Sequence, residues 1–446
     1  MKQPCTRRRF IARTSAGAVA ASLGVTAAPA FGARAFGARV FAAPAFGTRG
    51  ASEKIRLGFI GTGGRGQHHI GQFAEDFSKD VEIVAVCDVD QGHLEEAARL
   101  AGGKVRKTGD FRAVLDAKDI DAVVIAPPDH WHAIPAIEAC KAGKDVYVEK
   151  PLGQNVREGR LVADAAKKHS RIVAIGTQQR SGPHWIEAVR RIQAGEIGKV
   201  TFVHAWNAWD TTEMGGNIGN PPDGDPPPGV DYDTWLGPAP KRRFNPARFH
   251  FGFYFFWDYS GGMVSAWGVH LFDIVSWAMG QEIQAVSASG GKFVHQDIRE
   301  TPDTAEASFE CPGYTFVYTM RHGNGFKYYG ELDHGIDFFG TKGTLRINRL
   351  HFSVYPEDEE RKPSFVMKDA GMDIPHKKNW LECVRSRAKP NSDAEDGHRS
   401  SIYGHLANIA LRVGRRVRWD GKAETIVNDK EASALLTREY RSPWVL

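Results

Sequence analysis

The chain has 446 residues, of which 25% are charged and 42% hydrophobic, and its formal net charge is +5. This composition is typical of a globular protein and excludes collagen-like, disordered and disulfide-scaffold classes. Residues 1–50 contain eight lysines and arginines and no acidic residue, which leaves 50 basic and 53 acidic residues in the rest. The excess positive charge therefore belongs to the N-terminal segment, and the remainder gives no indication of a nucleic-acid or anionic-membrane partner.

Residues 1–50 are predicted to be an export signal followed by a low-complexity leader. The basic stretch Thr6–Ile11, with three consecutive arginines before an aromatic residue, precedes a small-residue apolar run at Ala16–Ala30. This order is typical of a twin-arginine signal, so we expect a periplasmic protein that folds before export. The run is too short and too rich in alanine and glycine for a membrane-spanning helix, so no membrane contact is expected after signal removal. A basic, disordered N-terminus is the alternative.

The four cysteines after the leader give no indication of a metal site or a redox motif. They are Cys87, Cys140, Cys311 and Cys383. Because none lies in a Cys-x-x-Cys arrangement, we predict buried free thiols, which fits folding in a reducing cytoplasm. His130 and His132 have no third ligand at a helpful spacing, so no metal is predicted.

Residues 55–66 have the pattern of a dinucleotide-binding turn. An apolar strand at 55–60 is followed by Gly61-Thr62-Gly63-Gly64-Arg65-Gly66 and then by a helix to about residue 77. The first glycine makes the tight turn, the second lets the backbone approach a pyrophosphate, and the third lets the helix pack closely. The helix N-terminus offers its free N–H groups to the phosphates.

Asp88 follows the second predicted strand, at residues 81–86, and lies 22 residues after Gly66. A carboxylate at this place accepts the ribose hydroxyl protons, and it would repel a 2′-phosphate. We therefore predict NAD as the cofactor and regard NADP as disfavoured. A turn residue at a strand end is the alternative for Asp88.

The alternation of strands and helices predicts a doubly wound parallel sheet over residues 54–178. The apolar run at 122–126 is typical of a strand covered on both faces. The loop Pro127–His132 follows this strand at its carboxyl end, where such sheets bind ligands. Two further strands are expected at 145–148 and 171–175, and Glu149-Lys150-Pro151 follows the first of them.

Residues 179–446 are predicted to form a separate α+β domain. The stretch 210–257 is irregular and aromatic, so we expect a packed loop that lines a cleft or contacts a neighbouring subunit. A helix is expected at 261–280. A large, mainly antiparallel sheet is expected from strands at about 282–295, 303–311, 313–321, 332–339 and 343–355. The expected fold class is α/β, with a Rossmann domain followed by this α+β domain.

Several motifs occur together in an order that resembles one protein family. They are Gly61–Gly66, Asp88, Pro127–His132, Glu149–Pro151 and Gly268–Asp273. With these motifs the chain resembles, over about residues 54–440, the glucose–fructose oxidoreductase/inositol dehydrogenase (Gfo/Idh/MocA) family. The stretch Gly176–Ser181 and the tail Pro443-Trp444 are similar to an exported branch of it. The resemblance implies an NAD(P)-dependent oxidoreductase that binds a carbohydrate between its domains and forms a homo-oligomer through the C-terminal sheet.

Lys150 and His270 are the first candidate catalytic residues. Lys150 follows a strand end that should face the nicotinamide, and burial beside a cationic ring would lower its pKa, so that it can exchange a proton with a hydroxyl group. The resemblance places this lysine at the reaction centre. Asp273 lies three residues after His270 on the same helical face, where its carboxylate could fix the imidazole tautomer. A surface lysine and a packed core histidine are the alternatives.

One position departs from the pattern of the family. Many of its dehydrogenases have an aspartate four residues before the histidine, where this chain has Ala266. The usual trio of lysine, aspartate and histidine is therefore incomplete. Asp258, Tyr259, Asp210 or His184 could replace the missing carboxylate, and the sequence leaves all four open.

The residues predicted to bind the cofactor come from the glycine turn and from the ends of the predicted strands. They are Gly61, Gly63, Gly64, Arg65, Gly66, Asp88, Pro127, His132, Glu149, Lys150 and Gln178. Gln178 and its neighbour Arg180 follow the sixth strand, where they line the cleft or form a polar turn.

An exported enzyme meets little free NAD, so a tightly bound cofactor is expected. The leading prediction is an oxidoreductase that transfers a hydride from a sugar or sugar derivative, with Trp206, Trp209 and Trp235 available to stack on sugar faces. One alternative is a redox-neutral glycoside hydrolase or lyase that acts through transient oxidation of the sugar. The other is a non-catalytic carbohydrate-binding protein with a vestigial cofactor site, against which intact Lys150 and His270 argue.

Overall fold

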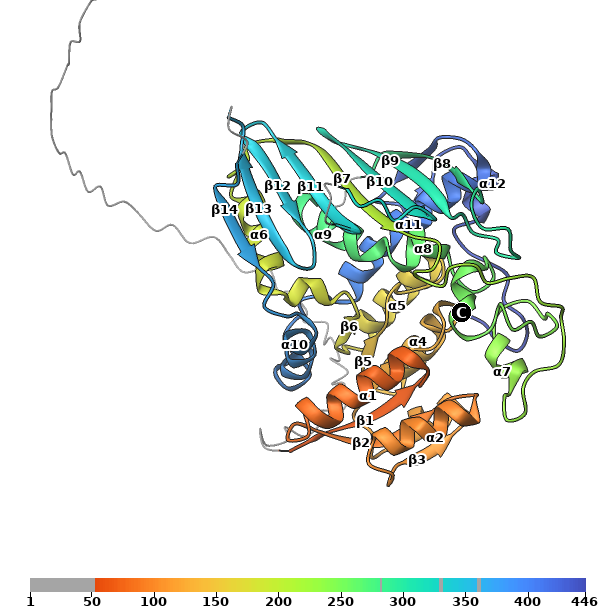
Figure 1. Ribbon diagram of the computed structural model, residues 1–446. Coiled ribbons are helices and arrows are strands. Elements are labelled where there is room, and N and C mark those ends of the chain that lie inside the picture. Colours follow the sequence, from red (N-terminus) through yellow and green to blue (C-terminus); the bar gives the residue numbers. More distant parts are fainter. Residues whose placement is uncertain (1–52, 281–282, 329–331, 359–361) are drawn as a thin grey trace, which may run out of the picture. The chain divides into compact units, whose positions relative to one another are not determined.

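The computed structural model describes residues 53–446, apart from 281–282, 329–331 and 359–361. The export signal and leader predicted at residues 1–50 lie outside the described residues. Two β-sheets dominate the described part of the chain, one in its first half and one in its second (Figure 1). No helix in this part is both long enough and apolar enough to span a membrane.

The first sheet is parallel and has the strand order β3-β2-β1-β4-β5-β6. Its strands are β1 (Ile55–Ile60), β2 (Val81–Cys87), β3 (Arg106–Thr108), β4 (Ala122–Ile125), β5 (Asp145–Val148) and β6 (Val173–Ile175). Every residue of β4 and β5 is buried, because helices cover both faces of the sheet. The order reverses between β1 and β4, and doubly wound sheets bind ligands at such a reversal. The predicted Rossmann sheet is confirmed.

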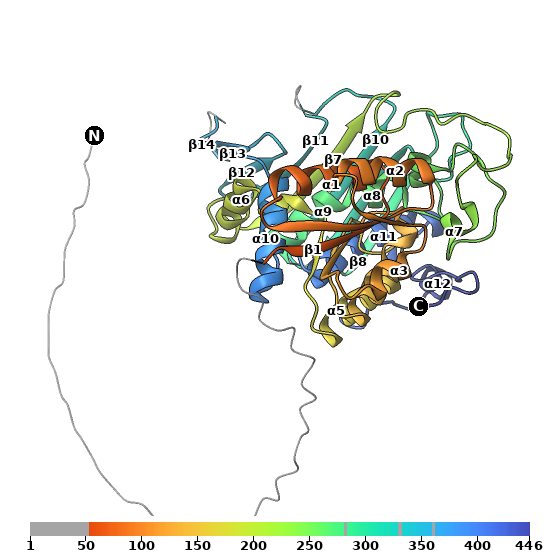
Figure 2. The same cartoon turned by 90° about the horizontal axis from the view of Figure 1, so that it is seen from below.

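Helices line both faces of this sheet (Figure 2). They are α1 (Gly64–Asp76), α2 (Gln91–Leu100), α3 (Phe111–Asp116), α4 (Ala133–Lys141) and α5 (Val156–Lys168). Helices α1 and α2 pack with Phe59 on one face, whereas α3, α4 and α5 pack with Val123 on the other. The side-chain oxygens of Asp90, Asp110 and Asn155 cap α2, α3 and α5, which fixes where these helices begin.

The second sheet has the strand order β14-β13-β12-β11-β7-β10-β9-β8-β15-β16 within the described residues. Its strands are β7 (Val200–Trp209), β8 (Ala285–Gly291), β9 (Thr304–Cys311), β10 (Tyr314–His322), β11 (His334–Gly340), β12 (Gly343–Ile347), β13 (His351–Pro356), β14 (Phe365–Lys368), β15 (Val417–Asp420) and β16 (Thr425–Ile426). Neighbouring strands run antiparallel except β7 and β10, which pair in parallel. The mainly antiparallel sheet is as predicted, but the strand expected at 343–355 is two strands, β12 and β13, that form a hairpin.

Helices α6 (Pro183–Gln193), α9 (Val269–Met279) and α11 (Ala394–Val413) lie along one face of the second sheet (Figure 1). Phe272 of α9 and Tyr403 of α11 pack together, and both contact Phe309 and Phe316 in β9 and β10. Most of α11 is buried, because it packs against α5, α9 and β8 at once. These aromatic contacts form the core of the second half.

The single helix expected at 261–280 is wrong, since the segment forms two helices. They are α8 (Gly262–Ala266) and α9, and the chain turns between them at Trp267-Gly268. A Cβ on Gly268 would lie 2.2 Å from the carbonyl oxygen of Val264, so only glycine allows this turn. The remaining helical elements are α7 (Tyr232–Leu236), α10 (Asp373–Ser386), α12 (Lys430–Ala434), η1 (Asp129–Trp131), η2 (Gln178–Ser181) and η3 (His250–Phe255).

Two C-terminal segments return to the first sheet. Trp380 of α10 is fully buried against Phe73 and Tyr147, with ring centroids 6.0 and 5.6 Å apart. Near the end of the chain, Trp444 packs edge-on against Trp131 with ring centroids 4.7 Å apart. The C-terminal part of the chain therefore helps to hold the loop after β4 in place.

The cysteines of the described residues are buried and form no disulfide. They are Cys87, Cys140, Cys311 and Cys383. Burial raises the pKa of the Cys140 thiol to about 12, so this group stays protonated and unreactive. The prediction of buried free thiols is confirmed.

Candidate active site

A cavity of about 560 Å³ lies at the carboxyl edge of the first sheet. The first half of the chain contributes the glycine turn, the end of β2 and the loops after β4, β5 and β6. The second half contributes the aromatic segment 210–257, the turn between α8 and α9, and the turn between β12 and β13. The size and the concave position are those of a small-molecule site. The predicted site residues in its wall are Gly61, Gly63, Gly64, Arg65, Asp88, Pro127, His132, Glu149, Lys150, Gln178 and His270.

The glycine turn has the geometry of a phosphate cradle. Gly61 has a φ of +79°, and a Cβ there would lie 2.3 Å from the backbone nitrogen of Pro127. A Cβ on Gly66 would lie 2.2 Å from the carbonyl oxygen of Gly61, so this glycine lets α1 begin directly against the turn. Gly64 lines the cavity, and the space at its Cβ position is open. The first N–H groups of α1 have no acceptor within the helix and are available to an anion.

Asp88 is held in a fixed position where β2 ends beside the glycine turn. Its Oδ2 accepts a hydrogen bond from the Thr62 N–H at 2.6 Å, and its Oδ1 accepts one from the Asp90 N–H at 2.9 Å. The residue also lines the cavity, where a carboxylate can bind ribose hydroxyls. The glycine turn and Asp88 together fit the adenosine and pyrophosphate parts of NAD.

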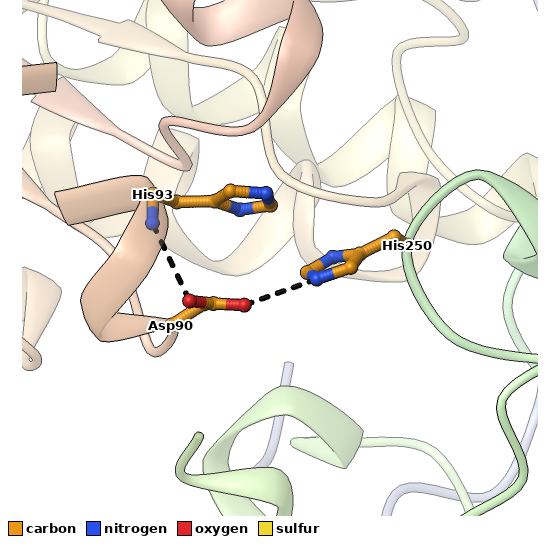
Figure 3. Close-up of side chains that lie close together, drawn as sticks. All are labelled: Asp90, His93 and His250. Carbon is orange, nitrogen blue, oxygen red and sulfur yellow. Dashed lines mark hydrogen bonds and ion pairs between the residues drawn. The ribbon is translucent and has the colours of Figure 1, made fainter. Parts of the chain in front are cut away.

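A second group at this end of the cavity joins the two halves of the chain. His250 Nε2 lies 3.0 Å from Asp90 Oδ2, and its ring centroid lies 4.3 Å from that of His93 (Figure 3). The Gln91 N–H also donates to the carbonyl oxygen of Gly229 at 3.0 Å. Asp90, His93 and His250 have side chains of the kinds that bind zinc, with candidate ligand atoms within 4.8 Å of one another. Sequence spacing did not reveal this group, because His250 comes from a distant segment.

Glu149 lies just after β5 and is the centre of a buried ionic cluster. Its Oε1 accepts a hydrogen bond from Arg65 Nε at 2.7 Å and lies 2.8 Å from His69 Nε2. Burial raises the pKa of Glu149, but the Arg65 charge and the His69 contact hold it well below its usual range. Arg65 and Glu149, both predicted to bind the cofactor, therefore bind each other and form one wall of the cavity.

Lys150 brings its amine to the second half of the chain. Its Nζ donates to the carbonyl oxygen of Ala266 at 2.8 Å and lies 5.8 Å from the centre of the Tyr254 ring. Burial lowers the pKa of Lys150, and this effect outweighs the carboxylates of Glu149 and Asp129, which raise it. A lowered pKa allows an amine to accept a hydroxyl proton. At position 266, where many relatives have aspartate, this chain offers Lys150 a backbone carbonyl oxygen.

His270 and Asp273 have different surroundings. The His270 ring lines the cavity, and its buried Nδ1 has no hydrogen-bond partner among the described residues. Burial and the positive charge of Arg349 lower the pKa of His270 well below its usual range, so the ring is neutral. Both Asp273 oxygens lie 2.9 Å from Arg180 Nε, and Ser400 Oγ donates to Oδ1 at 2.6 Å. The prediction that Asp273 fixes the His270 tautomer is wrong, because the carboxylate binds the buried guanidinium instead.

The loop after β4 is held in place by its two histidines. His132 Nδ1 lies 2.6 Å from the carbonyl oxygen of Pro151, and its Nε2 lies 2.9 Å from that of Pro127. His130 Nε2 lies 3.0 Å from the carbonyl oxygen of Trp235. Both imidazoles therefore connect this loop to neighbouring backbone, and His132 ties it to the loop after β5.

Gln178 and Arg180, which follow β6, have different surroundings, as His270 and Asp273 do. Gln178 lines the cavity, and its Oε1 is buried without a hydrogen-bond partner in the part of the chain that the structure describes. An orphaned amide oxygen in a cavity wall fits a ligand N–H group. Arg180 lies outside the cavity wall and is taken up by Asp273, so of this pair only Gln178 is a cleft residue.

The four side chains considered as replacements for the missing carboxylate lie outside the cavity wall. Asp258 forms an ion pair with Arg242 at 2.5 Å, and Asp210 is exposed. The other two are Tyr259, which is fully buried, and His184, whose Nε2 bonds the carbonyl oxygen of Asn348. None of the four open alternatives therefore lies in the cavity wall, where a replacement for the aspartate would be needed.

Of the three tryptophans predicted to stack on sugar faces, one lines the cavity. Trp235 lines the cavity, as expected. Trp206 and Trp209 are only 0% and 3% exposed and lie outside the cavity wall, so the prediction that they stack on sugar is wrong. Both belong to β7, a central strand of the second sheet, where packing takes up their surface. Trp267, in the turn between α8 and α9, lines the cavity instead.

Sequence reasoning missed two charged residues in the cavity wall, Asp129 and Arg349. The Arg349 guanidinium lies 4.7 Å from the centre of the Trp267 ring, and burial lowers the pKa of this arginine to about 10. No local signal marks it, because it reaches the cavity from the turn between β12 and β13. Asp129 lies in the loop predicted to bind ligands, so its carboxylate could have been identified from the sequence as a cavity residue.

Comparison with known families agrees with this geometry. Residues 55–177 match the model described as "Oxidoreductase family, NAD-binding Rossmann fold" of the Gfo/Idh/MocA group. Residues 204–297 and 351–446 match the corresponding "Oxidoreductase family, C-terminal alpha/beta domain". The chain therefore belongs to the Gfo/Idh/MocA oxidoreductase family, as its motifs indicated, and its first half is an NAD-binding Rossmann domain.

Individual relatives are named dehydrogenases and hydrolases. The scyllo-inositol 2-dehydrogenase (NAD(+)) of Bacillus subtilis is 27% identical over 386 residues, 83% of this chain and 97% of that protein. Inositol 2-dehydrogenase 1 of Saccharopolyspora erythraea is 35% identical over 151 residues, 34% of this chain and 44% of that protein. A glycosyl hydrolase family 109 protein of Shewanella is 30% identical over 179 residues, 37% of this chain and 38% of that protein. The last two matches span less than half of each relative.

Solved structures share the fold. The WlbA dehydrogenase from Bordetella pertussis, in complex with NADH and UDP-GlcNAcA, aligns with 82% of this chain and 99% of its own, with a TM-score of 0.62. Its sequence is 22% identical to this chain, so the comparison supports the architecture alone.

Proposed function

We propose that this protein oxidises a hydroxyl-bearing carbon of a sugar or cyclitol with an NAD cofactor that stays bound between turnovers, and that a second, carbonyl-bearing sugar takes the hydride back from the reduced cofactor. One observation carries the proposal. Lys150 and His270, from opposite halves of the chain, line the cavity that begins at the glycine turn. The inositol dehydrogenases among the relatives support a polyol substrate.

Each part of the cavity has a proposed role in binding the cofactor or the substrate. The N–H groups at the start of α1 would hold the pyrophosphate, Asp88 the adenosine ribose, and Gln178 an amide of the cofactor. Bound NAD supplies the hydride acceptor. Lys150, with its lowered pKa, accepts the proton of the substrate hydroxyl, and neutral His270 hydrogen-bonds to that oxygen. Arg349 offers donors to the other oxygens of the substrate.

The contact between His250 and Asp90 supports a cofactor that does not exchange freely. This contact and the bond from Gln91 to Gly229 cross from the second half to the first beside Asp88. Because they lie beside the predicted adenosine site, these contacts would slow the departure of a bound adenosine. The arginine motif at residues 7–9 supports export by the twin-arginine route. Retention of the cofactor would matter for an exported protein, because little NAD is free outside the cytoplasm.

Mass analysis of the purified, exported protein tests this function. The protein is denatured to release its cofactor, and intact protein is incubated with a panel of sugars and cyclitols whose products are identified by mass. We expect NAD from the denatured protein and a product two mass units lighter than one member of the panel. Absence of any released nicotinamide cofactor, with no product, would refute the proposal.

A redox-neutral glycoside hydrolase or lyase is the second candidate. Two observations support this candidate: the match to a glycosyl hydrolase family 109 protein and the alanine at position 266. In that reaction the hydride returns to the sugar, so an aryl glycoside would be cleaved without lasting reduction of the cofactor. Colour release with an absorbance at 340 nm that rises only transiently and returns to its starting value would select this candidate over net oxidation.

The second sheet is our proposed site of homo-oligomer formation. Its helices pack on one face, and Phe202 and Val366, which are 37% and 51% exposed, alternate with core residues and therefore belong to the other face. Light scattering of the purified protein is expected to give a mass that is a multiple of the single chain. A monomeric mass would contradict this part of the proposal.

A further inference from the structure

We propose that Asp129 is the carboxylate that balances the charge of Lys150 in this chain, in place of the aspartate that position 266 lacks. The inference rests on the proposed function and adds a positioning residue to it. Asp129 comes from the other half of the chain than position 266, so the amine receives its acidic partner from the Rossmann domain.

The loops that carry the two residues are fixed against each other. Strands β4 and β5 are neighbours in the sheet, and the Glu149 N–H donates to the carbonyl oxygen of Ile125 at 2.9 Å. One residue beyond η1, His132 contacts the carbonyl oxygen of Pro151 at 2.6 Å, next to Lys150. The loop that contains Asp129 therefore cannot move away from Lys150 without breaking this bridge.

The other side of the loop is held by the C-terminal tail. Arg438 Nη2 donates to the carbonyl oxygen of His130 at 2.9 Å, and its guanidinium also pairs with Glu158 at 2.7 Å. The ring of Trp444 packs against Trp131. The residues that directly follow Asp129 are thus anchored, which is the support that a positioned charged group needs.

Asp129 is buried but has one oxygen free. The residue is 2% exposed and lines the cavity. Ser260 Oγ donates to its Oδ2 at 2.5 Å. Its Oδ1 has no hydrogen bond within the described residues. A buried carboxylate is costly unless it is paired, so this free oxygen calls for a cationic or donor partner in the cavity.

Lys150 lines the same cavity as Asp129, and within the described residues the two side chains form no direct ion pair, so the carboxylate acts on the amine across the cavity. Its amine uses one hydrogen for the carbonyl oxygen of Ala266. The largest charge effects on the amine come from the carboxylates of Glu149 and Asp129 and the guanidinium groups of Arg65 and Arg349. The neutral rings of His270 and Tyr254 are the other titratable groups nearby.

Glu149 cannot serve as the free carboxylate. Its Oε1 already takes the bond from Arg65 and the contact with His69, and its Oε2 accepts from the Lys150 backbone N–H at 3.2 Å. Of these two carboxylates, Asp129 is the one whose second oxygen accepts no hydrogen bond from the residues that the structure describes. Burial raises the pKa of Asp129 and lowers that of Lys150, and the opposite charges of the pair offset both effects.

The pair gives the proton of the substrate hydroxyl a defined course. The O–H bond breaks, the proton binds Lys150 Nζ, and the ammonium that forms is stabilised by the Asp129 carboxylate. No charge is left unbalanced in the cavity. The proton then leaves to solvent after a net oxidation, or returns to the sugar oxygen in a redox-neutral reaction.

The test measures the titration of Lys150 directly. The purified protein with its own cofactor is acylated by acetic anhydride over a range of pH, and mass spectrometry of the peptide gives the midpoint for Lys150. In Asp129→Asn we expect this midpoint to fall by about one pH unit, because a neighbouring carboxylate raises an amine pKa. Turnover with the substrate found in the panel should fall about 100-fold, and the acid limb of kcat/KM should move to lower pH.

Three variants control the measurement. Asp129→Glu keeps the carboxylate and should return the midpoint towards that of the unmodified protein. Asp129→Asn combined with Ala266→Asp supplies a carboxylate from the other half of the chain and should raise the midpoint again. Asp210→Asn removes an exposed carboxylate outside the cavity and should change neither midpoint nor turnover.

An unshifted Lys150 midpoint in Asp129→Asn overturns the inference, even if turnover is lost, since the aspartate would then only support the fold. The two proposals fail separately. If no substrate is turned over but the midpoint shifts, the pairing stands and the proposed function fails.

Discussion

Replacing Asp273 with asparagine separates a structural role from a catalytic one. Asp273 is fully buried, and both of its oxygens lie 2.9 Å from Arg180 Nε. The substitution leaves the buried guanidinium with Asp396, 3.3 Å from Nη1, as its remaining counter-charge. Removing one partner of a buried ion pair costs about 3–5 kcal/mol. Because Asp396 stays, we expect the lower end, about 3 kcal/mol of the free energy of unfolding.

Thermal and urea unfolding, followed by tryptophan fluorescence, measure this cost. A loss of this size should lower the midpoint temperature by roughly 4 °C in a chain of this length. Arg180→Met combined with Asp273→Asn removes the uncompensated charge and should recover part of the loss. Where the single variant is folded, its pH profile should match that of the unmodified protein. Unchanged unfolding together with lost turnover would refute the reasoning and make Asp273 catalytic.

Four further predictions concern the proton acceptor, its titration, the retention of the cofactor and the export signal. Lys150→Met removes the proton acceptor and should lower kcat by about 1000-fold while NAD stays in the purified protein; retained turnover would exclude the lysine. Burial lowers the pKa of Lys150, so kcat/KM should rise with pH, as the amine loses its proton, at a midpoint below the usual lysine value of 10.5. His250→Ala breaks the contact with Asp90 and should release NAD during gel filtration, whereas full retention would contradict the role of this contact. Lysines in place of Arg8 and Arg9 should keep the protein out of the periplasm, as cell fractionation would show; unchanged export would exclude the twin-arginine route.

The first sheet could be predicted closely because its signals are local. Its buried strands are short apolar runs, and each lies between turn residues and an amphipathic helix. Gly61 and Asp88 directly follow strand ends and Lys150 follows one residue later, so strand positions alone place them at one edge of the sheet. Their location in the cavity wall needed no knowledge of the second half.

The rest of the site depends on contacts between distant segments. Arg349 and His250 reach the cavity from a turn and a long loop that have no periodic pattern. Helical spacing correctly places His270 and Asp273 in one helix, but it does not reveal that Arg180 competes for the carboxylate. The helix expected at 261–280 failed at Gly268 for a similar reason, because a close backbone approach decides where the chain turns.

The most direct test of the central claim is the absorbance at 340 nm of the purified protein, with its own cofactor, after a single addition of the substrate found in the panel. Hydride transfer to bound NAD predicts a rise that does not exceed one reduced cofactor per site and that Lys150→Met lacks. In a redox-neutral reaction the rise is transient and decays as product forms. No change at any time in the unmodified protein, while product still forms, would contradict hydride transfer at this site.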